Sequence, residues 1–596
     1  MNRKIIQAVV LLVMLGAFFL RLLPAHQGLP YLRYWDEPVI ASTALQMLKT
    51  GDFNPGFFHY GSLTIYICLG VDIVHFMHLM RSEPIPFEVI DGIFKHGAID
   101  MNGIQTVFDN GWLWEVSHPS FYLWNRAAMG FLGALTAGLI FLLARRFVGV
   151  GSALLAAAWL AVLPFHIERS ALVSPDLPTS FFAVLAILGA VIFVQEQQRR
   201  WLLVSLIACG LAAGSKYNGL LVVLAPALAV AFLQLKAARD SPSQKSFVGH
   251  WLALCLLPPV FFLVSTPYAL LDMPEFLSQA GFEVYHYSVR GHGAVSVEGG
   301  WGHLMLQLER IAENFGLLPS LLAVAGVVLA LRRGAAGWTL LVFPFVYFLF
   351  MAMTRVAFHR NLLVIYPMLT LTAAIAIDAV VRRLRSWDGK YRPWCQRGAV
   401  LVALVTALHV FLVGVGSLNN GWEIFQGSEN RSLAVDKLNE DWSNAERVGI
   451  AAELRIHPVD LERLEMPYEV RPHLELACAP GLYDLVVAGV QYVGLWSDQP
   501  KAKAEARRLN AAALDVPYQD FGGPARGDNV TRLDGLSRDP VLRFFETRRQ
   551  DAVVPEICAE LTAEGTTAQE EPVDTSSGET SSGDANEKNS VSSASS

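Results

Sequence analysis

Two adjacent acids follow the first apolar segment and are the residues of this chain best suited to chemistry. Asp36 and Glu37 come after the aromatic residues Tyr34 and Trp35 and before Pro38. A carboxylate pair beside aromatic side chains is typical of a general base with a neighbour that positions it. The same pattern is typical of a helix N-terminus, where acids are favoured. The local sequence leaves both interpretations open.

Several cations also stand at the ends of apolar segments. Lys216 and Tyr217 lie between two such segments with almost no linker. A lone lysine there fits a tight turn whose side chain snorkels to the interface, and it equally fits a cation aimed at a phosphate. The same two interpretations apply to Arg126, Tyr287, Arg290, His292, His359 and Arg360. Taken together, these residues predict a ring of cations around an anionic, membrane-borne ligand.

A short loop between two apolar segments adds a further group, with the stretches His166–Arg169 and Ser174–Asp176. Asp176 precedes a helical run and fits a helix cap. His166 and Glu168 carry side chains that ligate metals, but two ligands without a cluster predict a metal site only weakly. A solvated loop is the better interpretation of Glu168.

The composition shows what kind of protein presents these residues. Of 596 residues, 53% are hydrophobic and 17% are charged, against about 25% charged in soluble globular proteins. This excludes a purely soluble enzyme, a disordered protein and a fibrous one. Residues 551–596 hold ten acids and one lysine, a net charge of −9, so the total of −7 leaves +2 for the rest. That remainder argues against a general nucleic-acid partner.

The hydrophobic excess fills residues 1–416 and predicts a polytopic α-helical membrane protein with about eleven spans. A spanning helix needs about 20 mostly apolar residues. The predicted spans lie near 5–23, 125–144, 151–165, 177–195, 202–215, 218–235, 248–266, 316–331, 338–354, 361–381 and 398–416. The first segment also fits a signal peptide, but it lacks a small-residue cleavage site.

The basic clusters predict the orientation of these spans. Clusters of Lys and Arg lie at 3–4, 145–146, 199–200, 236–245, 332–333 and 382–397. Placing all of them in the cytoplasm requires an odd number of spans, with the N-terminus inside and the C-terminus outside. The outer face then carries loops at 24–124, 166–176 and 267–315 and everything after 417. The apolar stretch 61–80 is therefore expected to lie at the interface, since one more span would reverse every later segment.

The remainder of the chain divides into an outer domain and a tail. Residues 417–550 mix helical stretches with β-like runs such as 484–488 and predict a small extracytoplasmic α/β domain. Residues 551–596 are rich in Ser, Thr, Gly and Glu and predict a disordered tail. Cys478 and Cys558 could pair if this part faces an oxidising compartment, although spacing alone does not decide it.

The order of these motifs resembles the dolichyl-phosphate-mannose–protein mannosyltransferase-like family (glycosyltransferase family 39, GT-C fold), in its bacterial polyprenyl-phosphate-sugar-dependent branch. The resemblance covers about residues 1–416. It is carried by the Asp36-Glu37 pair, Gly51 to Leu63, Arg126, Pro164 with Asp176, Gly210 to Gly219, His286 to Gly293 and Phe358 to Pro367. Gly61 departs from the proline usual in the family, and an extra stretch at 81–118 with Phe108, Trp112 and Trp114 has no assigned role.

The resemblance implies an inverting glycosyltransferase that uses a sugar on a lipid phosphate. Asp36 would take the proton of an acceptor hydroxyl, and Glu37 would orient it or bind the acceptor. The implied donor-phosphate ligands are Arg126, Lys216, Tyr217, Arg290, His292 and Arg360, and the implied substrate-binding or supporting residues are His59, Tyr60, His166, Arg169 and Asp176. Cationic side chains can offset the charge on the leaving phosphate, so no metal or other cofactor is expected. If a divalent ion were used, Asp36 and Asp176 would ligate it.

The expected location is a bacterial plasma membrane, where a hexose or a pentose is transferred to a glycan, lipid or protein acceptor at the outer face. A flippase or transporter of lipid-linked sugars is an alternative. Such a protein would show internal repeats and ionisable residues near mid-membrane, whereas the ionisable residues here lie at span ends. A non-catalytic envelope assembly protein is a second alternative, and it would tolerate the loss of Asp36 and Glu37.

Overall fold

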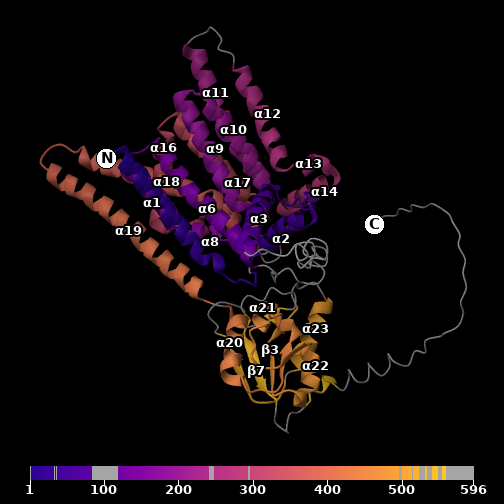
Figure 1. Ribbon diagram of the computed structural model, residues 1–596. Coiled ribbons are helices and arrows are strands. Elements are labelled where there is room, and N and C mark those ends of the chain that lie inside the picture. Colours follow the sequence, from indigo (N-terminus) through magenta and orange to yellow (C-terminus); the bar gives the residue numbers. More distant parts are fainter. Residues whose placement is uncertain are drawn as a thin grey trace, which may run out of the picture.

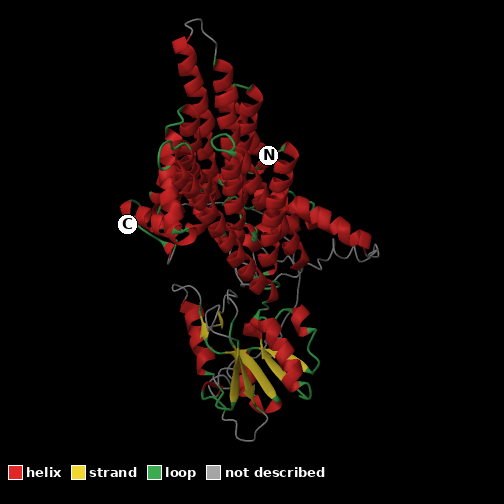
Figure 2. Cartoon of the chain, turned by 90° about the vertical axis from the view of Figure 1, so that its left-hand side faces the viewer, coloured by secondary structure: helices red, strands yellow, loops and turns green. Residues whose placement is uncertain are grey.

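The chain forms a helical membrane domain and a separate α/β domain in the computed structural model (Figure 1). The structure describes residues 2–32, 34, 36–82, 119–240, 247–292, 295–427, 429–494, 500–512, 514–522, 531–532, 540–547 and 554–558. Most of the extra stretch at 81–118 and nearly all of the predicted tail lie outside these residues. The strands are confined to the smaller domain (Figure 2).

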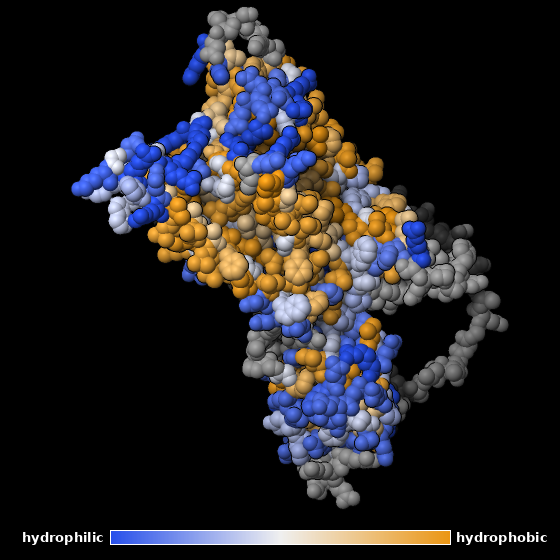
Figure 3. Space-filling view, turned by 60° about the vertical axis from the view of Figure 1, so that its left-hand side comes forward, coloured by the Kyte–Doolittle hydropathy of each residue, from blue (hydrophilic) through white to orange (hydrophobic). Residues whose placement is uncertain are grey.

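The membrane domain begins with α1 (Arg3–Leu22) and the short 3-10 helix η1 (Leu23–His26). It continues with α2 (Asp36–Thr50), α3 (Leu63–Ser82), α6 (Pro119–Ala144), α7 (Val150–Val162), α8 (Pro164–Ser170), α9 (Asp176–Glu196), α10 (Arg199–Ser215), η3 (Tyr217–Val223), α11 (Leu224–Asp240), α12 (Val248–Ser265), α13 (Tyr268–Leu271), α14 (Met273–Tyr285), the π-helical turn η4 (His286–Arg290), α15 (Trp301–Phe315), α16 (Leu317–Leu331), α17 (Ala335–Ala352), η6 (His359–Val364), α18 (Tyr366–Arg385) and α19 (Arg392–Gln426). Apolar side chains cover much of its surface in Figure 3, and the α/β domain below is mainly hydrophilic there.

Among the described residues, seven helices are long and apolar enough to cross a membrane, or up to nine if each of two bent pairs forms one span. The bent pairs are α7 with α8, at 58°, and α15 with α16, at 113°. Each of the predicted spans contains a helix, but α10 has only 17 residues and α18 ends in a turn with three arginines. The expected fold class is confirmed, while the count of eleven spans stays a prediction.

Helix α9 is the centre of the membrane domain. Most of its residues are buried, and it packs against α6, α10, α11, α17 and η6. Because small residues let helices approach closely within a membrane, its glycine and alanine positions suit this packing. Its first residue is Asp176, so the helix brings a carboxylate to one end of the bundle.

The α/β domain follows α19, which continues past the predicted boundary at 417 to Gln426. Its helices are α20 (Asn430–Trp442), α21 (Pro458–Leu461), α22 (His473–Cys478) and α23 (Pro500–Ala511), with short turns η7 (Ala452–Leu454) and η8 (Pro480–Leu482). Its strands are β1 (Val448–Ala451), β2 (Tyr468–Arg471), β3 (Leu485–Gly489), β4 (Tyr492–Val493), β5 (Tyr518–Phe521), β6 (Thr531–Arg532) and β7 (Leu542–Glu546).

One sheet has the strand order β2-β1-β3-β7-β5, and β4 pairs with β6 in a second sheet. Strand β1 runs parallel to β2 and β3, whereas β7 runs antiparallel to β3 and β5. Every residue of β3 is buried, which explains the apolar run noticed at 484–488. A disulfide joins Cys478 to Cys558, the pairing that the sequence left undecided.

A close approach of two glycines joins the segment before α3 to α10. A Cβ atom on Gly61 would lie 2.1 Å from the carbonyl oxygen of Gly214. The Cβ atom of a proline, the residue usual in the family, would collide in the same way. This close approach explains why a glycine stands at position 61. The contact brings Tyr60 beside Lys216, whose Nζ lies 5.8 Å from the centre of the tyrosine ring.

We expect Gly61→Ala to destabilise the membrane domain by about 1–3 kcal/mol, because the added methyl group forces the two backbones apart. Thermal unfolding in detergent measures this loss. Gly70→Ala is the matched control, since a Cβ atom added to this glycine of α3 would meet nothing within 4 Å. Equal unfolding midpoints for the two variants would contradict the packing argument.

Candidate active site

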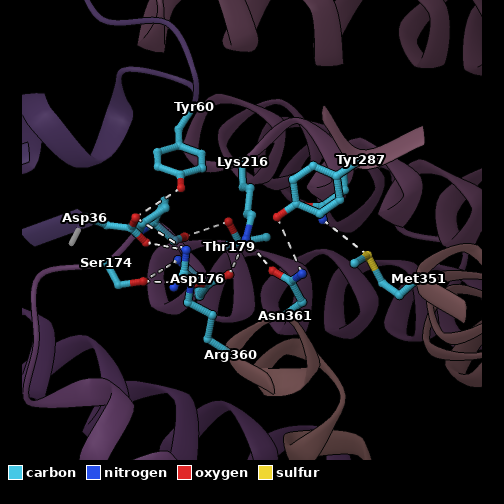
Figure 4. A network of polar contacts seen from close by, with 12 residues as sticks. Asp36, Tyr60, Ser174, Asp176, Thr179, Lys216, Tyr287, Met351, Arg360 and Asn361 are labelled. Atoms are coloured by element: carbon cyan, nitrogen blue, oxygen red, sulfur yellow. Dashed lines mark hydrogen bonds and ion pairs between the residues drawn. The ribbon is translucent and has the colours of Figure 1, made fainter. Parts of the chain in front are cut away.

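Asp36 lies at the start of α2 with two polar partners. The Tyr60 hydroxyl donates a hydrogen bond of 3.2 Å to its Oδ1, and Arg360 Nη2 lies 3.0 Å from its Oδ2 (Figure 4). The positive end of the α2 dipole also favours an acid at this position. The side chain keeps 16% of its surface exposed, so the carboxylate is oriented without being sealed off.

A second carboxylate lies on the other side of Arg360. Arg360 Nε is 3.8 Å from Oδ2 of Asp176 at the start of α9. Lys216 Nζ donates to Asp176 Oδ1 and to Asn361 Oδ1, both at 2.7 Å, and Ser174 Oγ donates to Asp176 Oδ2. The acids and cations therefore alternate in the order Asp36, Arg360, Asp176 and Lys216. We call these four side chains the charge network.

The charges around the network shift three pKa values. Burial and the neighbouring Asp36 hold the pKa of Tyr60 well above its usual value, so the tyrosine remains a hydrogen-bond donor. Burial alone lowers the pKa of Arg360, but the charges of Asp36 and Asp176 more than offset it and the net shift is upward. Burial also lowers the pKa of Lys216, but the charge and hydrogen bond of Asp176 together with Tyr287 more than offset it, so the net shift is upward. Both cations stay charged at neutral pH.

A cavity of about 440 Å³ opens beside Lys216, the member of the charge network that lines it. Its polar lining consists of His59, Tyr60, Lys216, Tyr217, Asn218, Glu283 and Tyr287. Its apolar lining consists of Leu220, Leu221, Val223, Leu224, Ala280, Val284 and Phe350. A site with one charged region and a large apolar wall suits an amphipathic ligand with an anionic head.

Histidines and one glutamate form a chain that begins at the cavity, where His59 and Glu283 line it. His59 Nδ1 lies 2.8 Å from Glu283 Oε1, and His286 Nδ1 lies 3.5 Å from Glu283 Oε2. His286 Nε2 is 3.0 Å from His292 Nδ1. Burial, together with the charges of His286 and Arg360, lowers the pKa of His292. Arg290 is exposed, with its guanidinium 5.5 Å from the Phe282 ring, and is not part of this chain.

Arg126 does not line this cavity, and its expected role as a donor-phosphate ligand stays a prediction. Its Nε and Nη2 donate to the two carboxylate oxygens of Glu37, each at 2.7 Å, and Nη1 donates to the carbonyls of Ala25 and Gln27. Both side chains are at most 1% exposed. This pair engages both side chains and fixes the first turn of α2, in which Asp36 lies.

His166 and Arg169 have partners outside the charge network, and their expected contact with substrate stays a prediction. His166 is fully buried in α8, where its Nδ1 meets Arg21 Nη2 of α1 at 2.8 Å. The Arg169 guanidinium lies over the rings of Tyr34 and Phe165. These contacts hold the broken helix α7–α8 against its neighbours.

Tyr217 lines the cavity but uses its hydroxyl on the backbone. It donates to the carbonyls of Phe58, at 2.6 Å, and Tyr60, at 3.1 Å. Tyr217 thus fixes the segment that carries His59 and Tyr60. Its contribution to the site is to shape the cavity wall, and its hydroxyl is already engaged.

Sequence reasoning missed Asn361 and Glu283. Asn361 connects Lys216 to Tyr287, whose hydroxyl lies 3.5 Å from Asn361 Nδ2. It stands next to Arg360 in the stretch 358–367, and a polar residue beside a proposed ligand was a usable signal. Glu283 precedes His286 by three residues, the spacing that puts two side chains on one helix face.

The residues present do not fit a divalent metal. Asp36 and Asp176, the implied ligands, already face Arg360 and Lys216. In the part of the chain that the structure describes, no three His, Cys, Asp or Glu side chains are grouped for a metal ion. A metal would have to displace both cations from their carboxylates, so no chemical step is assigned to one.

Residues 126–263 match a family model described as dolichyl-phosphate-mannose-protein mannosyltransferase. The match confirms the family resemblance inferred from the motifs, and the matched residues include Asp176 and Lys216. No curated protein matches the chain.

The chain is also similar to several solved structures. The crystal structure of ArnT from Cupriavidus metallidurans in the apo state has 14% identity and a TM-score of 0.47, over 91% of this chain and 98% of that chain. The structure of the same protein bound to undecaprenyl phosphate has 14% identity and a TM-score of 0.46, over 91% of this chain and 98% of that chain. The Archaeoglobus fulgidus oligosaccharyltransferase in the apo form has 12% identity and a TM-score of 0.45, over 82% of this chain and 70% of that chain. These likenesses are distant, and no residue role is taken from them.

We expect Glu37→Gln to destabilise the protein by about 3–5 kcal/mol, since it leaves the Arg126 charge buried without a counter-charge. Thermal unfolding in detergent measures the loss. Glu168→Gln is the control, because Glu168 pairs with Arg169 while 46% exposed, and such pairs contribute about 0–1 kcal/mol. Similar losses in the two variants would contradict the role assigned to the buried pair.

Proposed function

We propose, because residues 126–263 match the dolichyl-phosphate-mannose-protein mannosyltransferase family, that this protein is a membrane glycosyltransferase. It moves a hexose or a pentose from a polyprenyl-phosphate donor to an acceptor hydroxyl. The observation that carries the proposal is the position of the Asp36 carboxylate, which is held by Tyr60 and Arg360 beside a cavity that Lys216 lines.

The cavity supports a lipid-phosphate donor. Its polar lining offers Lys216, Tyr60 and Tyr287 to a phosphate, and its apolar lining from η3, α14 and α17 offers a wall for a polyprenyl chain. Arg360 Nε has no hydrogen-bond partner in the described part of the chain and lies only in ion-pair range of Asp176. We propose that a phosphate oxygen reaches this buried donor with a charge-assisted hydrogen bond, although Arg360 does not line the cavity in this structure.

The proposed reaction is a single displacement at the anomeric carbon. Asp36 takes the proton of the acceptor hydroxyl. At the same time the acceptor oxygen attacks C1 of the sugar from the face opposite the phosphate. The bond between C1 and the phosphate oxygen breaks, and its electron pair leaves with the lipid phosphate. Lys216 and Arg360 offset the charge that develops on this phosphate. The products are the glycosylated acceptor with inverted C1 and the lipid monophosphate, and protonated Asp36 returns its proton to water.

The proposed location is the outer face of a bacterial plasma membrane. The basic clusters favour a cytoplasmic N-terminus and an extracytoplasmic α/β domain. The disulfide between Cys478 and Cys558 supports this orientation, because such bonds persist in oxidising compartments. The acceptor is a glycan, a lipid or a protein on that side, and we propose no metal or other cofactor.

We expect Asp36→Asn to lower sugar transfer by at least about 10²-fold while the donor still binds, because the amide cannot take the acceptor proton. The assay follows radiolabelled sugar from polyprenyl phosphates to water or membrane extract, with purified protein in nanodiscs. Asp52→Asn is the control, since Asp52 is an exposed carboxylate in the same outer loop. Transfer is expected to survive EDTA.

The same assay separates the alternatives. A wild-type protein that binds the lipid-linked sugar without consuming it would support a flippase. A protein that neither binds nor consumes it would support an envelope assembly role. Full activity of Asp36→Asn beside an active wild type would remove Asp36 from the chemistry.

We expect Lys216→Gln to lower kcat/KM for the donor by about 10- to 100-fold, the loss of one charge-assisted hydrogen bond to the phosphate. The variant also strands the buried Asp176, so the double variant Lys216→Gln with Asp176→Asn is made beside it. If Lys216 serves the phosphate, the double variant remains impaired, as measured by initial rates over a donor titration. Recovery in the double variant would show that Lys216 serves only to neutralise Asp176.

A further inference from the structure

Tyr31 of the first outer loop inserts into the α/β domain. The residue is 2% exposed, although it belongs to the part of the sequence that forms the membrane domain. The hydroxyl donates a hydrogen bond of 2.8 Å to Asp460 Oδ2 of α21 and accepts one of 2.9 Å from the backbone N–H of His457. One side chain of the loop thus makes two hydrogen bonds across the domain boundary.

The residues around Tyr31 are charged and are held by further contacts within the α/β domain. The Arg431 guanidinium of α20 lies 4.2 Å from the centre of the tyrosine ring. Asp460 also accepts hydrogen bonds from Ser432 Oγ at 2.6 Å and from Arg463 Nη1 at 3.0 Å. The α/β domain therefore holds Asp460 in place for the tyrosine, and the contact costs little reorganisation when it forms.

The insertion point lies beyond the carboxyl end of β1, since His457 and Asp460 follow that strand and η7 in the chain. Helix α21 lies at the edge of the α/β domain that faces the membrane domain (Figure 1). In open α/β sheets, this end of the parallel strands is where ligands bind. Here a residue of the same chain occupies that end.

Tyr31 stands only five positions before Asp36, and a packed core connects them. Leu32, next to Tyr31, is 3% exposed and belongs to one apolar cluster with Val39, Ala41 and Leu45 of α2. A shift of Tyr31 would therefore act on the helix that begins with Asp36, because packed cores transmit displacement.

We propose that Tyr31 is a positioning residue for the transfer reaction, through which the α/β domain holds Asp36 in its reactive orientation. This role rests on the proposed function, in which Asp36 is the base. A base displaced by about 1 Å loses much of its rate, so the α/β domain takes part in transfer without contributing a group to the chemistry.

The test compares Tyr31→Phe with wild type in the full chain. The variant keeps the ring and removes the hydroxyl bonded to a charged acid, so we expect kcat per donor-binding site to fall on the order of tenfold with donor KM unchanged. Backbone amides of Ile40–Leu45 in α2 are expected to exchange hydrogen faster. Tyr518→Phe, an exposed tyrosine of β5 in the same domain, is the control and should match wild type in all three measurements.

A double-mutant cycle tests the specific contact. Asp460→Asn is expected to lower kcat per site as Tyr31→Phe does, and the double variant should be no worse than the more impaired single variant, because both remove one interaction. Independent losses that multiply in the double variant would overturn the proposal.

The readouts separate this proposal from the proposed function. Unchanged kcat and unchanged exchange in Tyr31→Phe would overturn the positioning role while wild-type transfer still supports the enzyme. A loss of donor-binding sites in step with the loss of rate would also overturn it, since Tyr31 would then serve only folding. If wild type transfers no sugar but Tyr31→Phe speeds exchange in α2, the proposed function fails and the anchoring by Tyr31 stands.

Discussion

The buried ion pair between Glu37 and Arg126 is the contact on which the site depends. Arg126 satisfies both carboxylate oxygens and two backbone carbonyls of the segment after α1, so one side chain ties α6, α2 and the end of η1 together. Neither charge is tolerable alone at this depth of burial, since an unpaired buried charge is strongly destabilising. The pair therefore fixes the first turn of α2, and Asp36 lies in that turn.

In the charge network, the cations proposed to bind the donor phosphate are the same ones that hold the two carboxylates. Asp36, Arg360, Asp176 and Lys216 alternate in sign and carry no net charge as a group. Because each acid begins a helix, part of its stabilisation comes from the helix dipole, which leaves the cations able to interact with a further anion. In the proposed function, a phosphate in the cavity would compete with Asp176 for Lys216, and its departure would return Lys216 to that carboxylate.

The sequence predicts the parts of this site that sit at the ends of apolar segments, and it fails where tertiary contacts decide. Asp36, Lys216 and Arg360 are found because a charge at a span end is costly and therefore informative. Arg126 meets the same criterion, but its partner Glu37 lies far away in the chain, so local pattern cannot tell a sealed ion pair from an available cation. The α/β domain follows from the apolar run at 484–488, whereas the insertion of Tyr31 into it has no sequence signal, because a tyrosine at a membrane interface is ordinary.

Asp36 is held from two sides by different domains. Glu37 fixes its helix to the membrane domain through Arg126, and Tyr31 fixes the preceding segment to the α/β domain through Asp460. A single anchor would leave the segment free to pivot, whereas anchors at Tyr31 and Glu37, before and after Asp36 in the chain, restrict its direction. The proposed transfer from a lipid-borne sugar requires a fixed direction of the Asp36 carboxylate. The membrane sets the depth of the donor, and the base must meet the acceptor at that depth. Under the proposed function, the α/β domain belongs to the catalytic unit, because Tyr31 adds an anchor to those that Glu37, Tyr60 and Arg360 provide within the membrane domain.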